Sequence, residues 1–426
     1  MRPGGAARVA DVRGREVLDS RGRPTVAARC ALASGAVGLA SVPSGASTGA
    51  AEATDRRDGG TRYGGLGCRG AVAAVGGEIR DALLGRAWDQ AGLDAALVAL
   101  DGTPTKARLG ANAILAVSLA FARACAAERA VPLWRHLADL AGEEPVALPR
   151  PTINLLSGGK HAGGQVEVQD VLVVPASART IDEALETTYA VYACAAELGR
   201  ERYGARPLTA DEGGLAPEVP DAEAMLDLAV AAIERAGLRP GEEVALAVDV
   251  AASHFREGDG YRVGGALVPS SEMIERVARW LAAYPVVSVE DGLAEDDWAA
   301  WPDLRRRIGG RALALGDDLL CTNPALVARA VREEAADALL LKVNQVGTLS
   351  EADTARRLAR AAGWAVTVSA RSGETEDDWL ADLAVGWSGD QLKVGSITQS
   401  ERLAKWNRLL EIESDTGLPV VAWPSP

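Results

Sequence analysis

The sequence predicts an α/β fold, a TIM-like (β/α)8-type barrel preceded by an α+β N-terminal capping domain. Three observations support this prediction. Short apolar runs between residues 244 and 393 each end at a charged residue, helix-length segments separate these runs, and residues 1–135 lack the alternation. Because a barrel carries its active site at the carboxyl ends of its strands, we expect the charged residues to meet at one mouth.

Five apolar runs define the predicted mouth. They are residues 244–248 (VALAV), 286–289 (VVSV), 312–316 (ALALG), 338–341 (ALLL) and 391–392 (QL). The residues that follow them are, in order, Asp249, Glu290, Asp317, Lys342 and Lys393. A polar residue after one apolar run carries no information, whereas five in succession, spaced by helix-length segments, indicate a barrel.

The remaining segments set the expected domain limits. In the N-terminal unit, residues 1–135, we expect strands at 25–32 and 38–42 and helices at 69–84, 91–99 and 109–129. Residues 145–151 are interpreted as a linker, and residues 146–426 as the barrel domain. Barrel helices are expected near residues 181–199, 221–236, 271–283, 297–307, 324–335, 350–362, 376–386 and 400–413. Residues 166–174 (VEVQDVLVV) predict a strand that carries Gln169 and Asp170.

Composition excludes several classes of protein. A chain of 426 residues with 48% hydrophobic residues is long enough for two folded domains. The net charge of −14 argues against a nucleic-acid partner. We find no apolar run of the roughly 18 residues that span a membrane, and no signal peptide at the start. The five cysteines are widely spaced, as in reduced thiols, so we expect a cytoplasmic protein without a membrane partner.

The three strand-end carboxylates, Asp249, Glu290 and Asp317, predict a metal site. Carboxylates that converge at one mouth repel each other unless a cation lies between them. A ligand set made only of oxygen favours Mg²⁺ over zinc. Each residue taken alone is more often a helix cap or a surface acid, and it is their shared position at strand ends that favours the metal.

Lysine usage singles out Lys342 and Lys393. Only five of the 45 basic residues are lysines, and two of them follow predicted barrel strands. Arginine cannot act as a base at neutral pH, whereas a lysine whose pKa is lowered by burial or by a nearby cation can. We therefore interpret these lysines as candidate catalytic groups; the alternative is a pair of structural lysines bound to carboxylates.

Three further motifs are candidate binding or catalytic segments. Residues 211–214 (DEGG) form a glycine-rich turn that presents Glu212, or else an ordinary capped loop. Arg371 and Ser372 follow a predicted strand and offer a guanidinium and a hydroxyl suited to phosphate, or else a helix cap. Lys160 and His161 lie in a flexible, glycine-rich loop, where the alternative is a plain surface position.

The chain resembles enolase over essentially its whole length. The matching segments are residues 16–25 (EVLDSRGRPT), 42–49 (VPSGASTG), 106–115 (KARLGANAIL), 211–217 (DEGGLAP), 249–253 (DVAAS), 288–291 (SVED), 316–324 (GDDLLCTNP), 340–348 (LLKVNQVGT), 371–377 (RSGETED) and 400–405 (SERLAK). The resemblance implies an Mg²⁺-dependent hydro-lyase with two Mg²⁺ per site and a lysine as the base, which is the arrangement known from enolase-type sites.

The resemblance also implies a role for each residue. Asp249, Glu290 and Asp317 would hold the first Mg²⁺, and Ser47 would help to hold the second. Lys342 would take the C2 proton, and Lys393 would face the substrate carboxylate. Glu212 would act as the acid for the leaving 3-hydroxyl, supported by Asp170, and Gln169 and Lys160 would help to bind the substrate. Arg371 and Ser372 would bind the phosphate, and His161 would close over the site.

The departures from the enolase pattern surround the reacting end. The family sequence Ser-His-Arg-Ser-Gly is here Ser369-Ala370-Arg371-Ser372-Gly373, so one histidine is missing. The family Gln-Glu is Gln169-Asp170, which shortens one carboxylate by a methylene. Lys160 adds a cation beside the expected phosphate position. A displacement of roughly 1 Å in such a site can cost about 100-fold in rate.

These features leave three hypotheses. The first is an enolase-type hydro-lyase that dehydrates 2-phosphoglycerate or a 2-phosphoglycerate-like phosphono acid. Within that class, the alternative is a specialised carboxyphosphonoenolpyruvate synthase of phosphinate antibiotic biosynthesis. The second is a non-catalytic binding protein that kept the fold. The third, a muconate- or mandelate-type enzyme, is disfavoured by the phosphate motif. The resemblance implies a homo-oligomer, either a dimer or an octamer.

Overall fold

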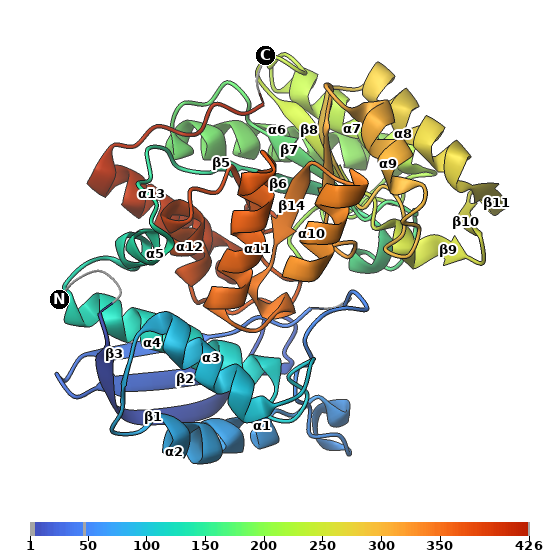
Figure 1. Cartoon of the computed structure of the whole chain (residues 1–426). Helices are drawn as coiled ribbons and strands as arrows, with labels where there is room; N and C mark the ends of the chain where they lie inside the picture. The colour runs from blue at the N-terminus through green and yellow to red at the C-terminus, as the bar shows by residue number, and fades with distance from the viewer. Residues whose placement is uncertain (1–4, 46–47, 425–426) are drawn as a thin grey trace.

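The computed structural model describes residues 5–45 and 48–424 and shows two packed parts (Figure 1). The N-terminal part is an antiparallel sheet in the order β3-β2-β1-β4. Its strands are β1 (Ala7–Leu18), β2 (Pro24–Leu32), β3 (Val37–Ser41) and β4 (Ala87–Trp88). Its helices are η1 (Arg62–Gly65), α1 (Arg69–Ala74), the π-helical turn η2 (Val75–Ile79), α2 (Arg80–Leu83), α3 (Gln90–Asp101) and α4 (Ala111–Glu128).

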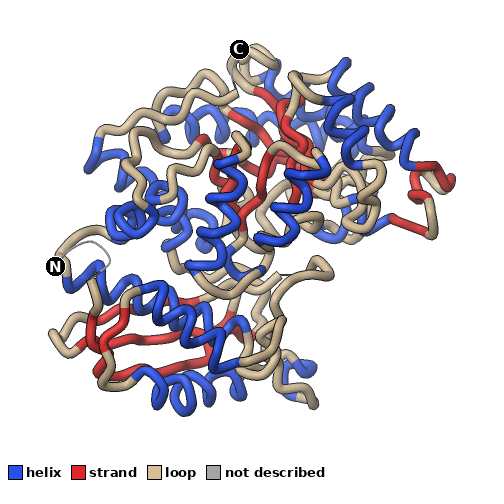
Figure 2. The backbone as a smooth tube through the Cα atoms, in the orientation of Figure 1, coloured by secondary structure: helices blue, strands red, loops and turns tan. Residues whose placement is uncertain are grey.

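The second part is a barrel whose strands lie inside a ring of helices (Figure 2). Its strands are β5 (Arg150–Pro151), β6 (Ile153–Ser157), β7 (Asp170–Val174), β8 (Ala245–Asp249), β12 (Val286–Glu290), β13 (Leu313–Gly316), β14 (Ala338–Leu341), β15 (Ala365–Ser369) and β16 (Gln391–Lys393). Its helices are α5 (Leu133–Ala141), α6 (Ile181–Tyr203), α7 (Ala222–Arg235), α8 (Ser270–Ala283), α9 (Trp301–Ile308), α10 (Pro324–Glu333), α11 (Leu349–Ala361), α12 (Trp379–Gly386) and α13 (Ser400–Thr416). The predicted fold class is confirmed.

The sheet order closes the barrel. The order is β5-β16-β15-β14-β13-β12-β8-β7-β6, and β5 and β6 are consecutive pieces of one extended segment. That segment pairs with β16 at one end and with β7 at the other, so the nine strands fill eight positions around the barrel. The five strands that deliver the predicted mouth residues are parallel neighbours or next neighbours, and nearly all of their residues are buried.

β7 differs from the strand expected at residues 166–174. It begins only at Asp170, and it runs antiparallel to both β6 and β8. The register pairs Asp170 with Asp249, the last residue of β8. Because β7 runs in the opposite direction, its first residue lies at the same mouth as the last residues of the parallel strands. A uniform β/α repeat therefore does not describe this part of the barrel.

Two elements of the N-terminal part correct the sequence analysis. β1 was not expected, because charged residues interrupt its sequence ARVADVRGREVL; its apolar positions Ala7, Val9 and Val12 are nonetheless buried. α4 is long and apolar enough to cross a membrane by length and composition, so the statement that no such run exists is wrong. Within the protein, 83% of that helix is buried, and it packs across β2 and β3 as a core helix does.

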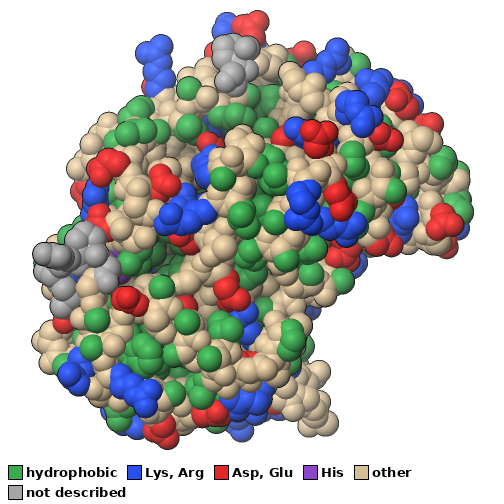
Figure 3. All heavy atoms as spheres, in the orientation of Figure 1, with side chains coloured by type: hydrophobic (Ala, Val, Ile, Leu, Met, Phe, Trp, Pro, Cys, Tyr) green, Lys and Arg blue, Asp and Glu red, His purple; other side chains and the backbone are tan. Residues whose placement is uncertain are grey.

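Three smaller features complete the fold. A three-stranded hairpin sheet, β9 (Arg256–Glu257), β10 (Gly260–Val263) and β11 (Ala266–Pro269), projects beside the mouth. The expected boundary at residue 135 falls inside α5, which packs against α12 of the barrel. On the face shown in Figure 3, acidic and basic side chains are interspersed.

Candidate active site

A cavity at the barrel mouth collects nine of the candidate residues. Its lining includes His161, Gln169, Glu212, Asp249, Asp317, Lys342, Arg371, Ser372 and Lys393. Glu290 and Asp170 are buried directly behind this lining and contact it. Lys160 lines a neighbouring groove, and Ser47 lies outside the described residues. The strand ends thus bring together residues that lie up to 232 positions apart in the sequence, from His161 to Lys393.

Lys393 lies between two of the predicted metal ligands. Its Nζ is 2.9 Å from Asp249 Oδ2 and 2.6 Å from Glu290 Oε2. Gln169 donates a further hydrogen bond to Asp249 Oδ2 at 3.1 Å. Burial would raise the pKa of Asp249, but Lys393 lowers it to about 2. Burial and the charge of Asp249 raise the pKa of Glu290 well above its usual range. Lys393 therefore favours the ionised form of Asp249, whereas Glu290 keeps its proton more readily than an ordinary glutamate.

Lys342 makes the corresponding pair on the next part of the mouth. Its ammonium group forms an ion pair with Asp317, whose other oxygen accepts a hydrogen bond from Gln345 Nε2 at 2.9 Å. Burial would lower the pKa of Lys342, but the negative charges of Asp317 and Glu290 raise it above its ordinary value. The lowering expected for Lys342 beside a bound cation therefore stays a prediction. Lys342 can become a base only when Asp317 no longer holds its proton.

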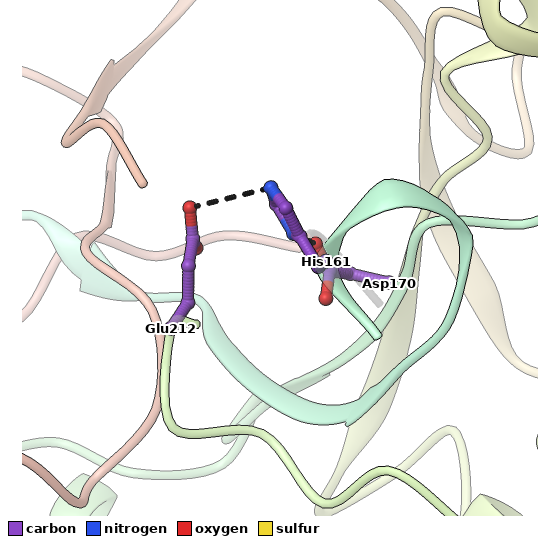
Figure 4. A group of neighbouring side chains, drawn as sticks. All are labelled: His161, Asp170 and Glu212. Atoms are coloured by element: carbon purple, nitrogen blue, oxygen red, sulfur yellow. Dashed lines mark hydrogen bonds and ion pairs between the residues drawn. The ribbon is translucent and has the colours of Figure 1, made fainter. Parts of the chain in front are cut away.

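A second cluster, His161, Asp170 and Glu212, forms the acid side of the cavity (Figure 4). His161 Nδ1 is 2.9 Å from Asp170 Oδ2, and His161 Nε2 is 3.8 Å from Glu212 Oε1. Burial would lower the pKa of His161, but these two carboxylates raise it to about 9. His161 in turn lowers the pKa of Glu212 against the effect of burial. The proton available on this side therefore resides on His161, next to Glu212.

Neighbouring backbone and side chains fix the acid side. Ser157 Oγ donates to Asp170 Oδ1 at 2.5 Å, and Asn154 Nδ2 donates to Glu212 Oε2 at 3.2 Å. Gly213, which follows Glu212, has φ 85°, and a Cβ at that position would lie 2.5 Å from Thr398 Oγ1. The turn in the predicted DEGG segment therefore needs glycine at this position in order to present Glu212.

Arg371 occupies the position expected for an anion-binding residue. Arg402 donates to the carbonyl oxygens of Arg371 and Ser372, both at 2.7 Å, and so fixes this loop after β15. The Arg371 guanidinium itself contacts Glu52 and Asn344, at 2.9 and 3.1 Å. Burial would lower the pKa of Arg371, but Glu52 raises it, so the guanidinium stays charged. A buried, charged, fixed guanidinium at a cavity suits phosphate or carboxylate.

The acidic groups fit a divalent cation. In the described part of the chain, the predicted ligands Asp249, Glu290 and Asp317 do not form one tight group, since lysines lie between them. A tighter group is Asp291, Asp317 and Asp318, in which one oxygen from each lies within 4.8 Å of the others. Burial and the charge of Asp317 raise the pKa of Asp318 to about 7. Crowded oxygen ligands whose ionisation is disfavoured are typical of a site for a hard cation.

Several site residues escaped the sequence analysis. Asp291 has φ 43°, and its two oxygens accept the backbone N–H groups of Asp317 and Asp318 at 3.0 and 2.8 Å. It therefore orients the loop after β13. Gln345 and Glu52 were missed because they do not follow a strand. Asp291 belongs to the SVED motif, which the sequence analysis quoted. Of the two acids in that motif, only Glu290 was interpreted as a site residue.

The comparisons with known families agree with this geometry. Residues 9–137 match the family described as the enolase N-terminal domain, and residues 145–421 match the enolase C-terminal TIM barrel domain. These matches support a lyase-type function of the enolase superfamily. Enolases generally use Mg²⁺, and the acidic groups at this mouth offer oxygen ligands of that kind. Both parts of the chain are covered in the right order, and the chain belongs to the enolase family.

Proposed function

We propose that the chain is an Mg²⁺-dependent hydro-lyase that removes the C2 proton and the 3-hydroxyl of 2-phosphoglycerate or a related phosphono acid. The observation that carries the proposal is the opposition of two groups across one cavity. Lys342 follows β14 and Asp170 begins β7, and three strand positions separate β14 from β7 in either direction around the barrel. A base and an acid cluster on opposite walls suit an elimination.

The reaction divides between these walls. Lys342 takes the proton from C2, and its bonding electrons enter the carboxylate, which becomes an enediolate. Lys393 faces that carboxylate and stabilises the added charge. The electrons then form the C2–C3 double bond, and the 3-hydroxyl leaves as water with a proton from the His161–Glu212 side. A positioned acid or base contributes about 10²–10⁴-fold to such a step.

Asp249, Glu290 and Asp317 are the residues that would hold Mg²⁺ at the carboxylate end. Mg²⁺ bound there would supply positive charge to the substrate carboxylate as the proton leaves. In the structure these three carboxylates form ion pairs with Lys342 and Lys393. If the carboxylates bound Mg²⁺ in place of the lysines, Lys342 would be released from Asp317. A second ion near Ser47 is expected from the family resemblance.

The second candidate is the specialised carboxyphosphonoenolpyruvate synthase. Two observations favour it. Ala370, where the enolase pattern has histidine, lines the cavity and leaves a methyl group in place of a ring. Asp170, the shortened carboxylate, is bound to both Ser157 and His161, so the acid side is rebuilt and not merely lost. The side chains at positions 170 and 370 are therefore both shorter than the family residues, which leaves more room in the cavity.

One assay separates the candidates. Turnover of 2-phosphoglycerate would be measured with Mg²⁺ and with a chelator, beside turnover of the glycerate ester of phosphonoformate, in which a carboxylate replaces one phosphate oxygen. Fast, Mg²⁺-dependent turnover of the first acid supports an ordinary enolase, and preference for the ester supports the specialised enzyme. Absence of both turnover and C2 proton exchange with either acid would show a non-catalytic binding protein.

A further inference from the structure

A second hollow shares a wall with the catalytic cavity. It lies between the loop at residues 159–167 and the β10–β11 hairpin, and Lys160, His254, Phe255, Arg262 and Gly264 are among its lining residues. We call it the outer groove. His254 lines both the outer groove and the catalytic cavity. The two spaces are therefore neighbours that share His254 in their walls.

The turn η3 (Gly159–His161) joins the two spaces as well. His161 lines the catalytic cavity, whereas Lys160, the residue before it, lines the outer groove and is exposed. Consecutive residues of one short turn thus present a cation to each space. A substrate group that extended past His161 would meet the ammonium group of Lys160 next.

One polar group of this shared wall can accept a ligand as a hydrogen-bond partner. His254 Nδ1 is buried and has no hydrogen-bond partner among the residues that the structure describes. A buried nitrogen without a hydrogen-bond partner is unfavourable, and a ligand atom that pairs with it removes that cost. Burial and the charge of Lys160 lower the pKa of His254 to about 4, so its ring is neutral at neutral pH and Nδ1 can carry the proton.

The charges in the outer groove favour an anion. Over residues 5–45 and 48–424, no carboxylate lies within 4.0 Å of Lys160 Nζ. The acid that lines the groove, Glu167, accepts the backbone N–H of Gly264 at 2.6 Å, and Arg262 pairs with Glu257 and donates to Gly265 O at 3.1 Å. Lys160 is therefore the cation there whose charge is not offset by a close partner.

We propose that the outer groove binds a second anionic group of the substrate, a carboxylate or phosphoryl oxyanion, with Lys160 as its charged ligand and His254 as a hydrogen-bond donor. The inference rests on the proposed function, because it requires the primary acid to occupy the catalytic cavity. It deepens that function by naming the substrate class: a 2-phosphoglycerate-like acid extended by a further anionic group on the side of His161.

The first test is a ratio of affinities. Calorimetry would compare the glycerate ester of phosphonoformate with 2-phosphoglycerate, both with Mg²⁺, and the ester is expected to bind more tightly. Lys160→Ala is expected to lower the ratio of the two association constants about tenfold, as for the loss of a charge-assisted hydrogen bond. His254→Phe is expected to lower it as well. The control Arg306→Ala removes an exposed cation on α9 and is expected to leave the ratio unchanged.

The second test uses the chain's three histidines as reporters. In ¹⁵N-histidine-labelled protein, His161 reports on the catalytic cavity and His254 on the shared wall. His136 in α5, whose Nδ1 lies 2.8 Å from Arg129 Nη1, serves as the reference. 2-Phosphoglycerate is expected to shift His161, and the ester is expected to shift both His161 and His254. In Lys160→Ala the His254 shift is expected to be lost while the His161 shift remains.

The outcomes separate this inference from the proposed function. Turnover decides the function, whereas the affinity ratio and the His254 shift decide the outer groove. An ester that wild-type protein does not bind, that shifts His161 alone, or whose preference survives in Lys160→Ala overturns the inference even if 2-phosphoglycerate is turned over. A Lys160-dependent His254 shift supports it even if dehydration is slow.

Discussion

Glu52, in the N-terminal part, accepts two hydrogen bonds from the guanidinium of Arg371, in the barrel, at 2.9 and 3.1 Å. Both side chains are almost fully buried, with 6% and 4% of their surface exposed. Glu52 also lies 3.4 Å from Gln345 Nε2, which in turn contacts Asp317. The N-terminal part is thus connected to the candidate anion site and, through one amide, to a candidate metal ligand.

Replacing Glu52 by Gln should change both the stability of the protein and its affinity for phosphate. A buried ion pair that loses one charge is destabilised, here by about 1–3 kcal/mol because Gln keeps a hydrogen bond. Removing the negative charge should at the same time tighten binding of inorganic phosphate at Arg371, by roughly threefold to tenfold. Urea unfolding and calorimetry measure the two effects. Glu351→Gln, which alters the interdomain pair with Lys106, is the control, since its phosphate affinity should not change.

Loss of Asp249 or Asp317 should abolish Mg²⁺ binding. Both residues offer oxygens at the mouth, and each is bound to a lysine that would be left with less compensation. Asp249→Ala and Asp317→Ala should lower Mg²⁺ affinity about 100-fold or more with an intact far-UV spectrum, whereas the exposed acid in Asp303→Ala should have no effect. Unchanged calorimetric Mg²⁺ titrations in both variants would contradict the ligand assignment.

Lys342→Arg should stop exchange of the substrate C2 proton with deuterium from solvent. The substitution keeps the charge beside Asp317, but a guanidinium has no accessible neutral form at neutral pH. Mass spectrometry of recovered 2-phosphoglycerate measures the exchange. Lys106→Arg, at a buried lysine away from the cavity, is the matched control and should exchange as wild type does. Wild-type exchange in Lys342→Arg would rule out its role as the base.

The double change Ala370→His with Asp170→Glu should distinguish an ordinary from a specialised enzyme. If the native acid side is specialised, 2-phosphoglycerate should exchange its C2 proton but lose water slowly. Restoring the two family residues should then raise dehydration by about 10²-fold, as expected for a positioned acid–base group. Rapid dehydration by the native chain, with no gain in the double variant, would favour an ordinary enolase.

Asp94 predicts a pH-dependent interdomain contact. It is 1% exposed in α3, accepts hydrogen bonds from Ser350 of α11, and burial raises its pKa from 3.8 to about 6. The unfolded carboxyl ionises at lower pH than the folded one, so stability should fall as pH rises from about 4 to 6. Asp94→Asn should be more stable by about 1–3 kcal/mol at pH 7 and equal at pH 4. A difference in unfolding free energy between Asp94→Asn and wild type that is the same at pH 4 and at pH 7 would contradict this prediction.

The sequence predicted the parallel strands and their end residues because those strands are buried on both faces. Runs such as ALLL have no other simple interpretation when helix-length segments flank them, and the residue that ends each run follows directly. Asp249, Glu290, Asp317, Lys342 and Lys393 were located in this way, and all five lie at the mouth.

The remaining features depend on contacts between distant segments. The antiparallel direction of β7 leaves no trace in its own residues, because it is set by pairing with β6 and β8. Glu52 shows its importance only once Arg371 is beside it. The raised pKa of Lys342 likewise depends on which carboxylates the lysine meets after folding.

The reversed direction of β7 has an evolutionary consequence. Because the chain enters β7 at the mouth, Ser157, Lys160, His161, Gln169 and Asp170 all belong to one continuous segment of 14 residues, 157–170. Lys342 and Lys393, by contrast, belong to two separate strand ends, those of β14 and β16. If relatives exchanged this one segment, much of the acid side and of the outer groove would change together, while Lys342 and its strand stayed the same. Substrate range can therefore diverge in this architecture by replacement of one short segment, without a change in the barrel.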